Sequence, residues 1–553
     1  MLLTKIISSL ENCFLDNDIS MFSELSRVSL LKNEKLSFQI LCTHTPDDGA
    51  LRRLYDLRIE GALAEYVSVR EVVSVPVTMP VVNPRDCDNY LRSAPGLYPD
   101  LLLPLRYGNK VSVLKGCLCS LWIDIDLREA HNVLAGESTL KFYFVYGDNL
   151  ASTPSIVLDV INAELPEQEL KFTEWFYCDC LANYYNCEVW SERHWEIIEN
   201  FANTAVKNGI NMLLTPVFTP SLDTYIGGER LTTQLVGVKK ESDEYSFDFS
   251  LLDRWIDMCD RIGIQYLEIS HFFTQWGARH APKIMATVDG EYKKIFGWET
   301  DATDHEYVDF LRSFVAAFLH HMKYRGDDKR CYFHISDEPT KEHLESYNAA
   351  KNAISDLLDG YVIMDALSNF EFYSQGLVET PIPSSNHIEP FLNADIEGLW
   401  TYYCSSQWKD VSNRFIAMPS YRNRSIGMQM YKYNIVGFLH WGYNFYNNQF
   451  SYDAIDPYTD TCGDGWVPAG DTFSVYPGAD GNTLESLRIS VFYDALQDLR
   501  AMKLAESLCG KESVLKAIEE AFGDKISFNK CAHTSAQMLS VRDAVNNLIK
   551  NNV

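Results

Sequence analysis

Short apolar runs divide the first part of the chain into segments of strand length. Turn-forming pairs such as Pro95-Gly96 separate runs that are apolar throughout or alternate apolar with polar positions: residues 36–41, 111–113, 120–125 and 140–145. Regularly spaced strands of this kind are typical of antiparallel sandwiches. The pattern therefore predicts an all-β domain over residues 1–168, built as an antiparallel β-sandwich.

After Pro166 the pattern changes to short apolar runs that alternate with helical segments. Eight runs have strand length: residues 175–181, 210–216, 265–271, 331–336, 361–366, 382–388, 398–404 and 436–441. Helices are predicted between several of them, over residues 191–209, 250–263 and 303–326. The last helix has a capping box at Thr303 and Glu306 and ends on a glycine. These alternating units predict a TIM-like (β/α)8 barrel over residues 169–483. A doubly wound open sheet is the alternative, but it lacks support from a glycine-rich phosphate turn after the first strand.

The rest of the chain, residues 484–553, is predicted to be helical. Ile489, Phe492, Leu496 and Leu499 follow one another at spacings of three and four, which gives an apolar face expected to pack on the barrel. The segment before it, residues 453–481, is rich in Asp, Gly and Pro. A loop of that length is either functional or disordered.

Composition narrows the possible functions. The chain has 553 residues, 46% of them hydrophobic, and a formal charge of −28, which argues against nucleic-acid partners because phosphate binding needs a basic face. We find no apolar run of the roughly 18 residues that a membrane span requires, and the region after Met1 lacks the apolar core and cleavage site of a leader. The 14 scattered cysteines are expected to be reduced core thiols. Together these features predict a globular cytoplasmic protein.

The most informative residues are Asp337 and Glu338, two adjacent carboxylates at the end of the fourth predicted strand. Pro339 disfavours helical geometry at Glu338, so the strand must stop there, and Thr340 is expected to cap a helix that runs to about Gly360. A turn at the strand's end can bring both carboxylates into one pocket, and barrels carry their chemistry at this face. The pair therefore predicts acid/base catalysis on a polar substrate.

Polar and aromatic residues also gather where the other strands are expected to end. Aromatic side chains present a flat apolar face on which a sugar ring can stack, while amides, imidazoles and carboxylates bind its hydroxyls. We therefore take these residues as candidates for substrate binding: Asn183, Tyr184, His271, Trp276, Asn386, His387, Glu389, Trp400, Trp441, Tyr443 and Asn444. Core packing is the alternative for Trp400 and Trp441. Tyr402 and Tyr403 point to opposite faces of a strand, so at most one should face the pocket centre.

No metal or cofactor is expected. Cys178 and Cys180 faintly resemble half of a zinc site, but no second pair at ligand spacing accompanies them. Asp460, Asp464 and Asp471 match no EF-hand spacing. We interpret these three carboxylates as solvated loop residues.

The adjacency of the two acids bears on the mechanism. Retaining glycosidases with a protein nucleophile hold two carboxylates about 5–5.5 Å apart across the scissile bond, and inverting enzymes about 6.5–9.5 Å. Consecutive acids sit more easily on one side of that bond. This favours substrate-assisted cleavage, in which a 2-acetamido group of the sugar is the nucleophile. A glycosidase that pairs Glu338 with Glu389 remains an alternative.

Several motifs resemble a known family. Residues 333–339 (FHISDEP), 413–419 (NRFIAMP) and 437–444 (GFLHWGYN) look like signatures of the bacterial domain of unknown function 4091, and residues 486–500 resemble its closing helix. That group resembles glycoside hydrolase family 123, the β-N-acetylgalactosaminidases. The likeness spans roughly residues 170–505 and implies a β-sandwich ahead of a catalytic barrel.

The resemblance also implies roles for the acidic pair. Asp337, ionised, would accept the acetamido N–H and turn the carbonyl oxygen towards the anomeric carbon. Glu338 would give its proton to the leaving oxygen and then act as base on water, with a pKa raised by burial and by the adjacent anion. Tyr402 or Tyr403 would hold the acetamido oxygen. Retention of configuration is the implied outcome.

The favoured hypothesis is an intracellular, exo-acting β-N-acetylhexosaminidase that prefers galactosamine and works on imported glycan fragments, without a nucleic-acid or membrane partner. A barrel glycosidase of different specificity is the second hypothesis. The third is a carbohydrate-binding protein whose barrel no longer catalyses, although binding alone does not need a protonatable acid. The sequence leaves the oligomeric state open.

Overall fold

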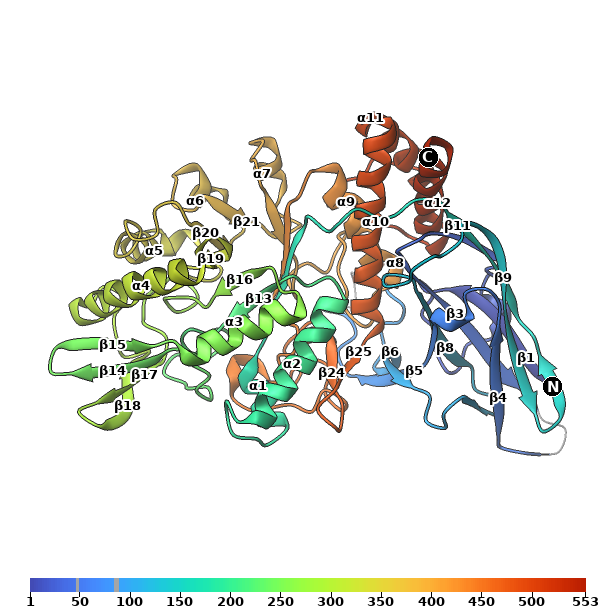
Figure 1. The fold of residues 1–553 in the computed structure, drawn as a ribbon, viewed down its shortest axis with the longest axis horizontal. Helices are drawn as coiled ribbons and strands as arrows, with labels where there is room; N and C mark the ends of the chain where they lie inside the picture. The colour runs from blue at the N-terminus through green and yellow to red at the C-terminus, as the bar shows by residue number, and fades with distance from the viewer. Residues whose placement is uncertain (46–48, 84–88) are drawn as a thin grey trace.

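The computed structural model describes residues 1–45, 49–83 and 89–553. Its N-terminal part consists of two sheets, seen on the right of Figure 1. The first sheet has the order β1 (Leu2–Ser8), β3 (Lys35–His44), β8 (Cys119–Asp126), β5 (Val67–Val77) and β6 (Gly96–Pro104). The second has the order β2 (Arg27–Leu31), β11 (Ser155–Ile161), β9 (Gly136–Tyr146), β4 (Arg52–Glu60) and β7 (Lys110–Leu114), and β10 (Asn149–Ser152) pairs with β9. The predicted β-rich N-terminal region is confirmed.

One hydrophobic cluster holds these two sheets together. Phe38 of β3 meets Phe142 of β9 edge to face, with ring centroids 6.0 Å apart, and both side chains are fully buried. In the second sheet, buried residues of β4, β7 and β9 alternate with more exposed ones, as expected for strands with one face on a core, whereas β3 and β8 of the first sheet are buried almost throughout. The antiparallel prediction needs one correction, because β11 pairs with β2 in parallel.

Eight parallel strands form a nearly closed barrel in the middle of the chain. They are β12 (Lys171–Glu174), β13 (Met212–Thr215), β16 (Tyr266–Ile269), β19 (Cys331–Phe333), β20 (Val362–Ala366), β21 (Thr380–Ile382), β22 (Trp400–Tyr402) and β23 (Gly437–His440). Their order is β21-β20-β19-β16-β13-β12-β23-β22, so the first strand pairs with the eighth. A parallel bridge between Ser384, just after β21, and Tyr402 brings the remaining two edges together.

Two of the predicted strands lie elsewhere. The pattern predicts a strand over residues 175–181, but β12 ends at Glu174 and a helix, α1 (Cys178–Tyr184), follows. Most of α1 is buried, and a short, fully buried apolar run looks alike in a strand and in a helix. The sixth strand ends at Ile382, so most of the predicted run 382–388 is loop.

The helices outside the barrel begin and end largely where the sequence signals lie. They are α2 (Glu192–Lys207), α3 (Ser250–Ile262), α4 (His305–Arg325), α5 (Leu344–Asn352), α6 (Phe370–Ser374), α7 (Glu389–Asn393), α8 (Ser420–Arg424) and α9 (Ile426–Lys432). Asp304, and not the predicted Thr303, caps α4 by accepting the backbone N–H of Glu306 at 2.9 Å. Thr340 begins a short turn ahead of α5, which ends well before Gly360.

A small sheet extends the barrel on its far side from the N-terminal region, on the left of Figure 1. Its order is β15 (Glu244–Asp248), β14 (Gly237–Glu241), β17 (Ile284–Val288) and β18 (Glu291–Phe296). The strands come from the two connections that follow β13 and β16. The sequence analysis did not anticipate this sheet.

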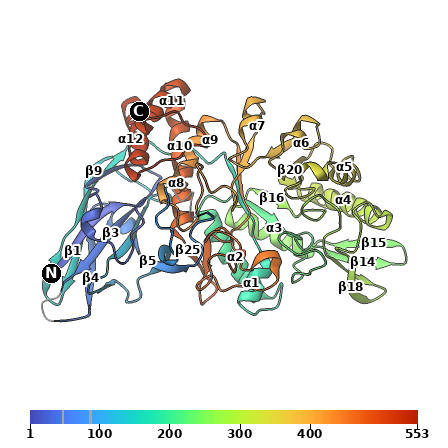
Figure 2. The ribbon, with the colours of Figure 1, turned by 180° about the vertical axis from the view of Figure 1, so that it is seen from behind.

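The predicted helical end is confirmed as α10 (Leu487–Cys509), α11 (Lys511–Phe522) and α12 (Ser535–Asn552), after a short hairpin of β24 (Val475–Pro477) and β25 (Thr483–Glu485). Helix α10 stands between the barrel and the N-terminal sheets, which Figure 2 shows from behind. Ile489, Phe492, Leu496 and Leu499 are buried on it. Among the described residues, no helix is long and apolar enough to cross a membrane.

Ion pairs tie the N-terminal sheets to this helix. Arg488 of α10 donates from Nε and Nη2 to the two carboxylate oxygens of Asp100 on β6, at 2.8 and 3.0 Å, and both side chains are buried. Arg542 of α12 joins Glu34, at 2.8 Å, to Asp498 of α10, at 3.0 Å. The contact between the two parts is therefore charged as well as apolar.

Candidate active site

A cavity of about 140 Å³ opens at the carboxyl ends of the barrel strands. Its lining comes from the ends of seven of the eight strands or from the segments that follow them. The lining residues are Trp175, Asp223, Gln275, Trp276, Asp337, Glu338, Ala366, Tyr402, Cys404, Ser405, Leu439, Trp441 and Trp466. The adjacent acids, one tyrosine and two tryptophans of the predicted set are thus brought together here.

Asp337 and Glu338 are held in the cavity by backbone contacts on both sides. The N–H of Trp276 donates to the carbonyl of Asp337 at 2.9 Å, and the N–H of Glu338 donates to the carbonyl of Ala366 at 3.1 Å. Glu338 has φ 41°, in the left-handed region that residues other than glycine rarely adopt. Such backbone strain costs about 1–3 kcal/mol and is concentrated at functional sites. It lets both consecutive side chains line the same cavity.

The two carboxyl groups have raised pKa values. Burial raises the pKa of Glu338, while a 2.6 Å hydrogen bond from the Tyr402 hydroxyl to its Oε1 opposes that shift. Burial, and then the charges of Glu338 and Asp223, hold the pKa of Asp337 well above its ordinary range. Two adjacent buried acids do not both ionise readily, which favours the form of the pair that holds one proton.

A cluster of charged side chains lies in the barrel interior beside the acids. His334 on the segment after β19 contacts Glu268 of β16 through Nε2 at 2.7 Å and Asp365 of β20 through Nδ1 at 3.2 Å. Burial disfavours its charged form, but these two carboxylates outweigh that effect and raise the pKa of His334 to about 10. The same Asp365 oxygen accepts the N–H of Ile335 at 3.1 Å. The cluster therefore fixes the chain just ahead of Asp337 and supplies a positive charge near it.

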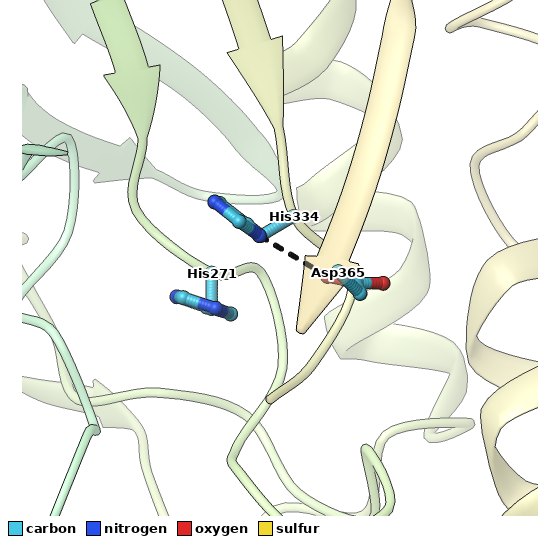
Figure 3. Close-up of side chains that lie close together, drawn as sticks. All are labelled: His271, His334 and Asp365. Carbon is cyan, nitrogen blue, oxygen red and sulfur yellow. Dashed lines mark hydrogen bonds and ion pairs between the residues drawn. The ribbon is translucent and has the colours of Figure 1, made fainter. Parts of the chain in front are cut away.

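His271 stacks on His334 in this cluster, as Figure 3 shows together with Asp365. The ring centroids are 4.3 Å apart and the planes differ by 20°. Burial and the neighbouring His334 hold the pKa of His271 well below its ordinary range, so this ring is neutral. The three residues are close enough for one metal ion. However, ring nitrogens bind metals in the ring plane, and parallel stacked rings do not direct two of them at one point. Both His334 nitrogens also already face carboxylates.

Replacing His334 by alanine is expected to lower the free energy of unfolding by about 3–5 kcal/mol, because Glu268 and Asp365 lose the cation between them. Urea titration followed by tryptophan fluorescence would measure the change. His320→Ala is the matched control, since that histidine is exposed on α4. Equal losses for the two variants would contradict the assignment of a buried ion cluster.

Tryptophans form the apolar part of the cavity wall. Trp441 donates from Nε1 to Asp471 Oδ2 at 2.9 Å and lies against Trp466, with ring centroids 5.5 Å apart. Trp175 donates from Nε1 to Glu268 at 2.8 Å. Trp276 has φ 58°, a second strained position in the lining. These contacts fix the rings before any ligand arrives.

The long segment after β23 is packed into the structure and supplies part of this wall. Residues 453–481 contribute Trp466 to the lining and Asp471 behind it. The backbone of Asp471 and Thr472 passes so close to Gly442 that a Cβ there would meet the Asp471 carbonyl at 2.4 Å. Of the two expectations for this loop, function or disorder, the packing favours function.

A second hollow, about 820 Å³, adjoins the cavity and shares Glu338 and Tyr402 with it. Asn386, His387 and Glu389 line this groove and are exposed. The predicted residues of the sixth strand's end are therefore beside the acids but outside the cavity that holds both of them.

The remaining predicted residues line neither hollow and have packing contacts instead. Trp400 lies over Gly437 of β23, and the Tyr403 hydroxyl is buried 3.4 Å from Asn423. The hydroxyl of Tyr443 donates to the carbonyl of Phe201 at 2.7 Å, deep in the core. His271 belongs to the ion cluster, and the side chain of Asn444 forms hydrogen bonds with the backbone of Tyr177. Asn183 and Tyr184 lie in α1. Tyr403 and Tyr443 point outwards to helices α8 and α2, and Asn183 and Tyr184 are exposed, so a position near a strand's end does not by itself place a side chain in the cavity.

Several lining residues escaped the sequence analysis. Asp223 and Gln275 follow β13 and β16 by a few residues, and the strand-end rule could have found them had it been applied to longer segments. Trp466 lies in the long loop, where no periodic signal exists. Cys404 and Ser405 lie just after β22, but the sequence analysis selected the aromatic residues Trp400, Tyr402 and Tyr403 of the same segment instead.

Comparison with known families decides how this site is classified. The sequence profile described as "Glycoside hydrolase 123, catalytic domain" matches residues 175–505, more than half of the chain. The chain belongs to glycoside hydrolase family 123. The resemblance to family 123 is confirmed by this match, and the matched range contains seven of the eight barrel strands, whereas β12 lies just ahead of it.

A solved structure of a family 123 enzyme has the same fold as this chain. A family 123 glycoside hydrolase from Clostridium perfringens, described in work on glycolipid glycan hydrolysis, aligns with a TM-score of 0.73 at 15% identity and covers 100% of this chain and 98% of its own. A family 39 glycoside hydrolase from Bacteroides cellulosilyticus aligns with a TM-score of only 0.33 at 9% identity, over 86% of this chain and 82% of its own. By sequence, no curated protein matches the chain.

Proposed function

We propose that this family 123 protein is an exo-acting, retaining β-N-acetylhexosaminidase that prefers N-acetylgalactosamine and uses the substrate's own acetamido group as nucleophile. One observation carries the proposal: the consecutive carboxylates Asp337 and Glu338 line a single small cavity. Consecutive acids on one side of the scissile bond leave the position of the nucleophile to the substrate.

Asp337 is the proposed partner of the acetamido group. Ionised, it accepts the amide N–H and turns the carbonyl oxygen towards the anomeric carbon, which that oxygen attacks as the glycosidic bond breaks. The resulting oxazolinium ion carries a positive charge that the carboxylate stabilises. The buried His334 cation favours the ionised form of Asp337, although burial and the neighbouring acids still leave the pKa of this carboxyl well above its ordinary range.

Glu338 is the proposed proton donor. Its raised pKa favours the protonated carboxyl, and the proton passes to the leaving oxygen as the bond breaks. The carboxylate then takes a proton from water, which attacks the anomeric carbon and opens the oxazolinium ring. Two inversions at that carbon give overall retention. A raised pKa of this kind argues for catalysis over the carbohydrate-binding alternative.

Tyr402 is the tyrosine that the site offers for the acetamido oxygen. Its hydroxyl reaches Glu338 in the cavity, whereas Tyr403 is buried away from it. In the absence of ligand the Tyr402 hydroxyl orients Glu338, and rotation of its O–H towards a bound acetamido oxygen is the proposed second role. The four tryptophans of the wall are proposed to surround the sugar ring.

The two hollows support exo action. The cavity of about 140 Å³ suits a single sugar unit, and the groove beside it starts at Glu338, where the leaving group must receive its proton. Asn386, His387 and Glu389 are therefore proposed to contact the leaving glycan. Glu389 is exposed there and does not line the cavity with Asp337, which weakens the alternative that pairs it with Glu338.

The proposed setting is the cytoplasm, with glycan fragments as substrates. The described cysteines are free thiols, as a reducing compartment would keep them. The Clostridium perfringens relative is described as acting on glycolipid glycans, which supports a glycan substrate here without fixing the linkage.

A pair of substrates and one inhibitor test the function. We expect hydrolysis of 4-nitrophenyl N-acetyl-β-galactosaminide but none of the matching β-galactoside, since only the former carries the nucleophile. A thiazoline mimic of the cyclic intermediate should inhibit competitively, because it places its ring where the oxazolinium forms. Equal turnover of both glycosides, together with no inhibition, would refute acetamido participation.

A further inference from the structure

Asp223 is a third carboxylate in the cavity, and the reaction described above does not use it. It lies in the segment after β13 and lines the cavity with the two acids. Its φ is 44°, a third strained position in the lining after Trp276 and Glu338. Among the described residues, none donates a hydrogen bond to its carboxylate, although both its backbone groups are bonded.

The backbone of Asp223 is held from two sides. Its N–H donates to Gln275 Oε1 at 2.5 Å, and the amide of Gln275 in turn donates to the carbonyl of Thr224 at 3.2 Å. The hydroxyl of Ser451, after β23, donates to the carbonyl of Asp223 at 2.8 Å. Three separate connections of the barrel thus fix this residue, and its side chain is left to face the cavity.

The charges around Asp223 do not neutralise it. Arg230 is the nearest cation, but its guanidinium donates to both carboxylate oxygens of Asp179, at 2.8 and 2.7 Å. The other charged or titratable neighbours are Glu338, Asp471, Asp337 and the buried Tyr177. Burial raises the pKa of Asp223 to about 7, with Arg230 opposing the shift. Among the described residues, the Asp223 carboxylate thus has no hydrogen-bond donor, and a bound ligand can supply one.

We propose that Asp223 is a specificity-determining residue that accepts hydrogen bonds from ring hydroxyls of the sugar in the cavity. The inference rests on the proposed function. Asp337 and Glu338 serve the acetamido group and the glycosidic oxygen, so the donors that remain on the ring are the hydroxyls at C3, C4 and C6. A carboxylate offers about four lone-pair sites, enough for two hydroxyls. Because the backbone is fixed, the position of the acceptor selects the hydroxyl configuration it can bind.

The test measures binding of N-acetylgalactosamine and of its 3-, 4- and 6-deoxy analogues to the wild type and to Asp223→Asn by isothermal titration calorimetry. In the wild type, removal of the contacted hydroxyl should weaken binding about 10- to 100-fold, as for a hydrogen bond to a charged group. In Asp223→Asn that penalty should fall to a few-fold, because the charged acceptor is gone. Asparagine has the same shape and tolerates positive φ, so the fold should persist. Asp243→Asn, in the exposed β14–β15 turn, is the matched control.

A second readout separates contact with the sugar from a purely structural role. The Asp223 charge raises the pKa of Asp337, so Asp223→Asn should move the acidic limb of kcat/KM to lower pH. Deoxy penalties that are the same in the wild type and in Asp223→Asn would overturn the inference even if the nitrophenyl galactosaminide is hydrolysed. Failure of the wild type to bind any of these sugars would also overturn it. The nitrophenyl assay reports the proposed function independently of either result.

Discussion

Replacing Glu338 by glutamine is expected to reduce kcat on natural glycosidic linkages by about 10²–10⁴-fold, the usual contribution of a general acid. Glutamine keeps the shape and can still accept the Tyr402 hydrogen bond at 2.6 Å, but it has no proton to give to the leaving oxygen. A 4-nitrophenyl leaving group needs little protonation, so its release should suffer far less. Steady-state kinetics on a disaccharide and on the aryl glycoside measure the difference.

The pH profile provides a second check on Glu338. The alkaline limb of kcat/KM reports loss of its proton, and because burial raises the pKa of this group the limb should lie above the ordinary range for glutamate. In Glu338→Gln the limb should disappear for the aryl glycoside. Glu389→Gln, in the neighbouring groove, is the matched control and should retain near wild-type kcat on that substrate. If Glu389→Gln instead loses most of its activity on the aryl glycoside, the alternative pairing of these two acids is correct.

Replacing Asp337 by asparagine is expected to lower kcat by about 10²–10³-fold, even for activated leaving groups. The loss has a different origin, because the carboxylate stabilises the positive charge of the oxazolinium and orients the acetamido group. The asparagine side chain is neutral, so it does not stabilise the positive charge. Its NH2 group can also face the N–H of the substrate's acetamido group, and two donors do not form a hydrogen bond. A better leaving group does not compensate, since the attack that forms the ring is impaired.

Thiazoline affinity should fall in parallel with the activity of Asp337→Asn, because the inhibitor resembles the charged intermediate. Inhibition constants for the variant and for Asp359→Asn, at an exposed carboxylate, measure this. Wild-type thiazoline affinity in Asp337→Asn would mean that this carboxylate does not face the acetamido group. The contrast in leaving-group dependence between the two acids is the sharpest test of their assigned roles.

The sequence predicts the barrel well because its strands lie between clear helix signals. Ser191 caps α2, and Gly263 and Gly326 end α3 and α4 with positive φ, as the sequence signals indicate. The first strand was misplaced because residues 175–181 are buried on all sides, and periodicity cannot then separate a strand from a helix. The small sheet of β14, β15, β17 and β18 was missed because three of its four strands are largely exposed and lack an apolar run, and because they come from two separate connections.

Site residues could be predicted from the sequence only where a few neighbouring residues determine their position. Asp337 and Glu338 stand next to a proline at a strand's end, and Trp441 follows β23 directly, so their placement follows from a few residues. Asp223 and Trp466 reach the cavity through longer segments, whose paths depend on contacts such as those of Gln275 and Gly442. Strand-end residues that point outwards to a helix, such as Tyr443 towards α2, look the same in sequence as those that point into the cavity.

The buried pair of Arg488 and Asp100 has a consequence for how the molecule could be divided. The predicted change of architecture near residue 168 suggests a place to cut the chain into two fragments. However, a fragment that starts there would lack Asp100, which is the counter-ion of the buried Arg488. Arg542 would lose Glu34 and keep only Asp498 of its two described carboxylate partners. Fragments that start at this boundary should therefore aggregate unless these arginines are replaced. Fusion of the barrel and the C-terminal helices to a different N-terminal domain would require acidic residues on that domain that pair with the arginines.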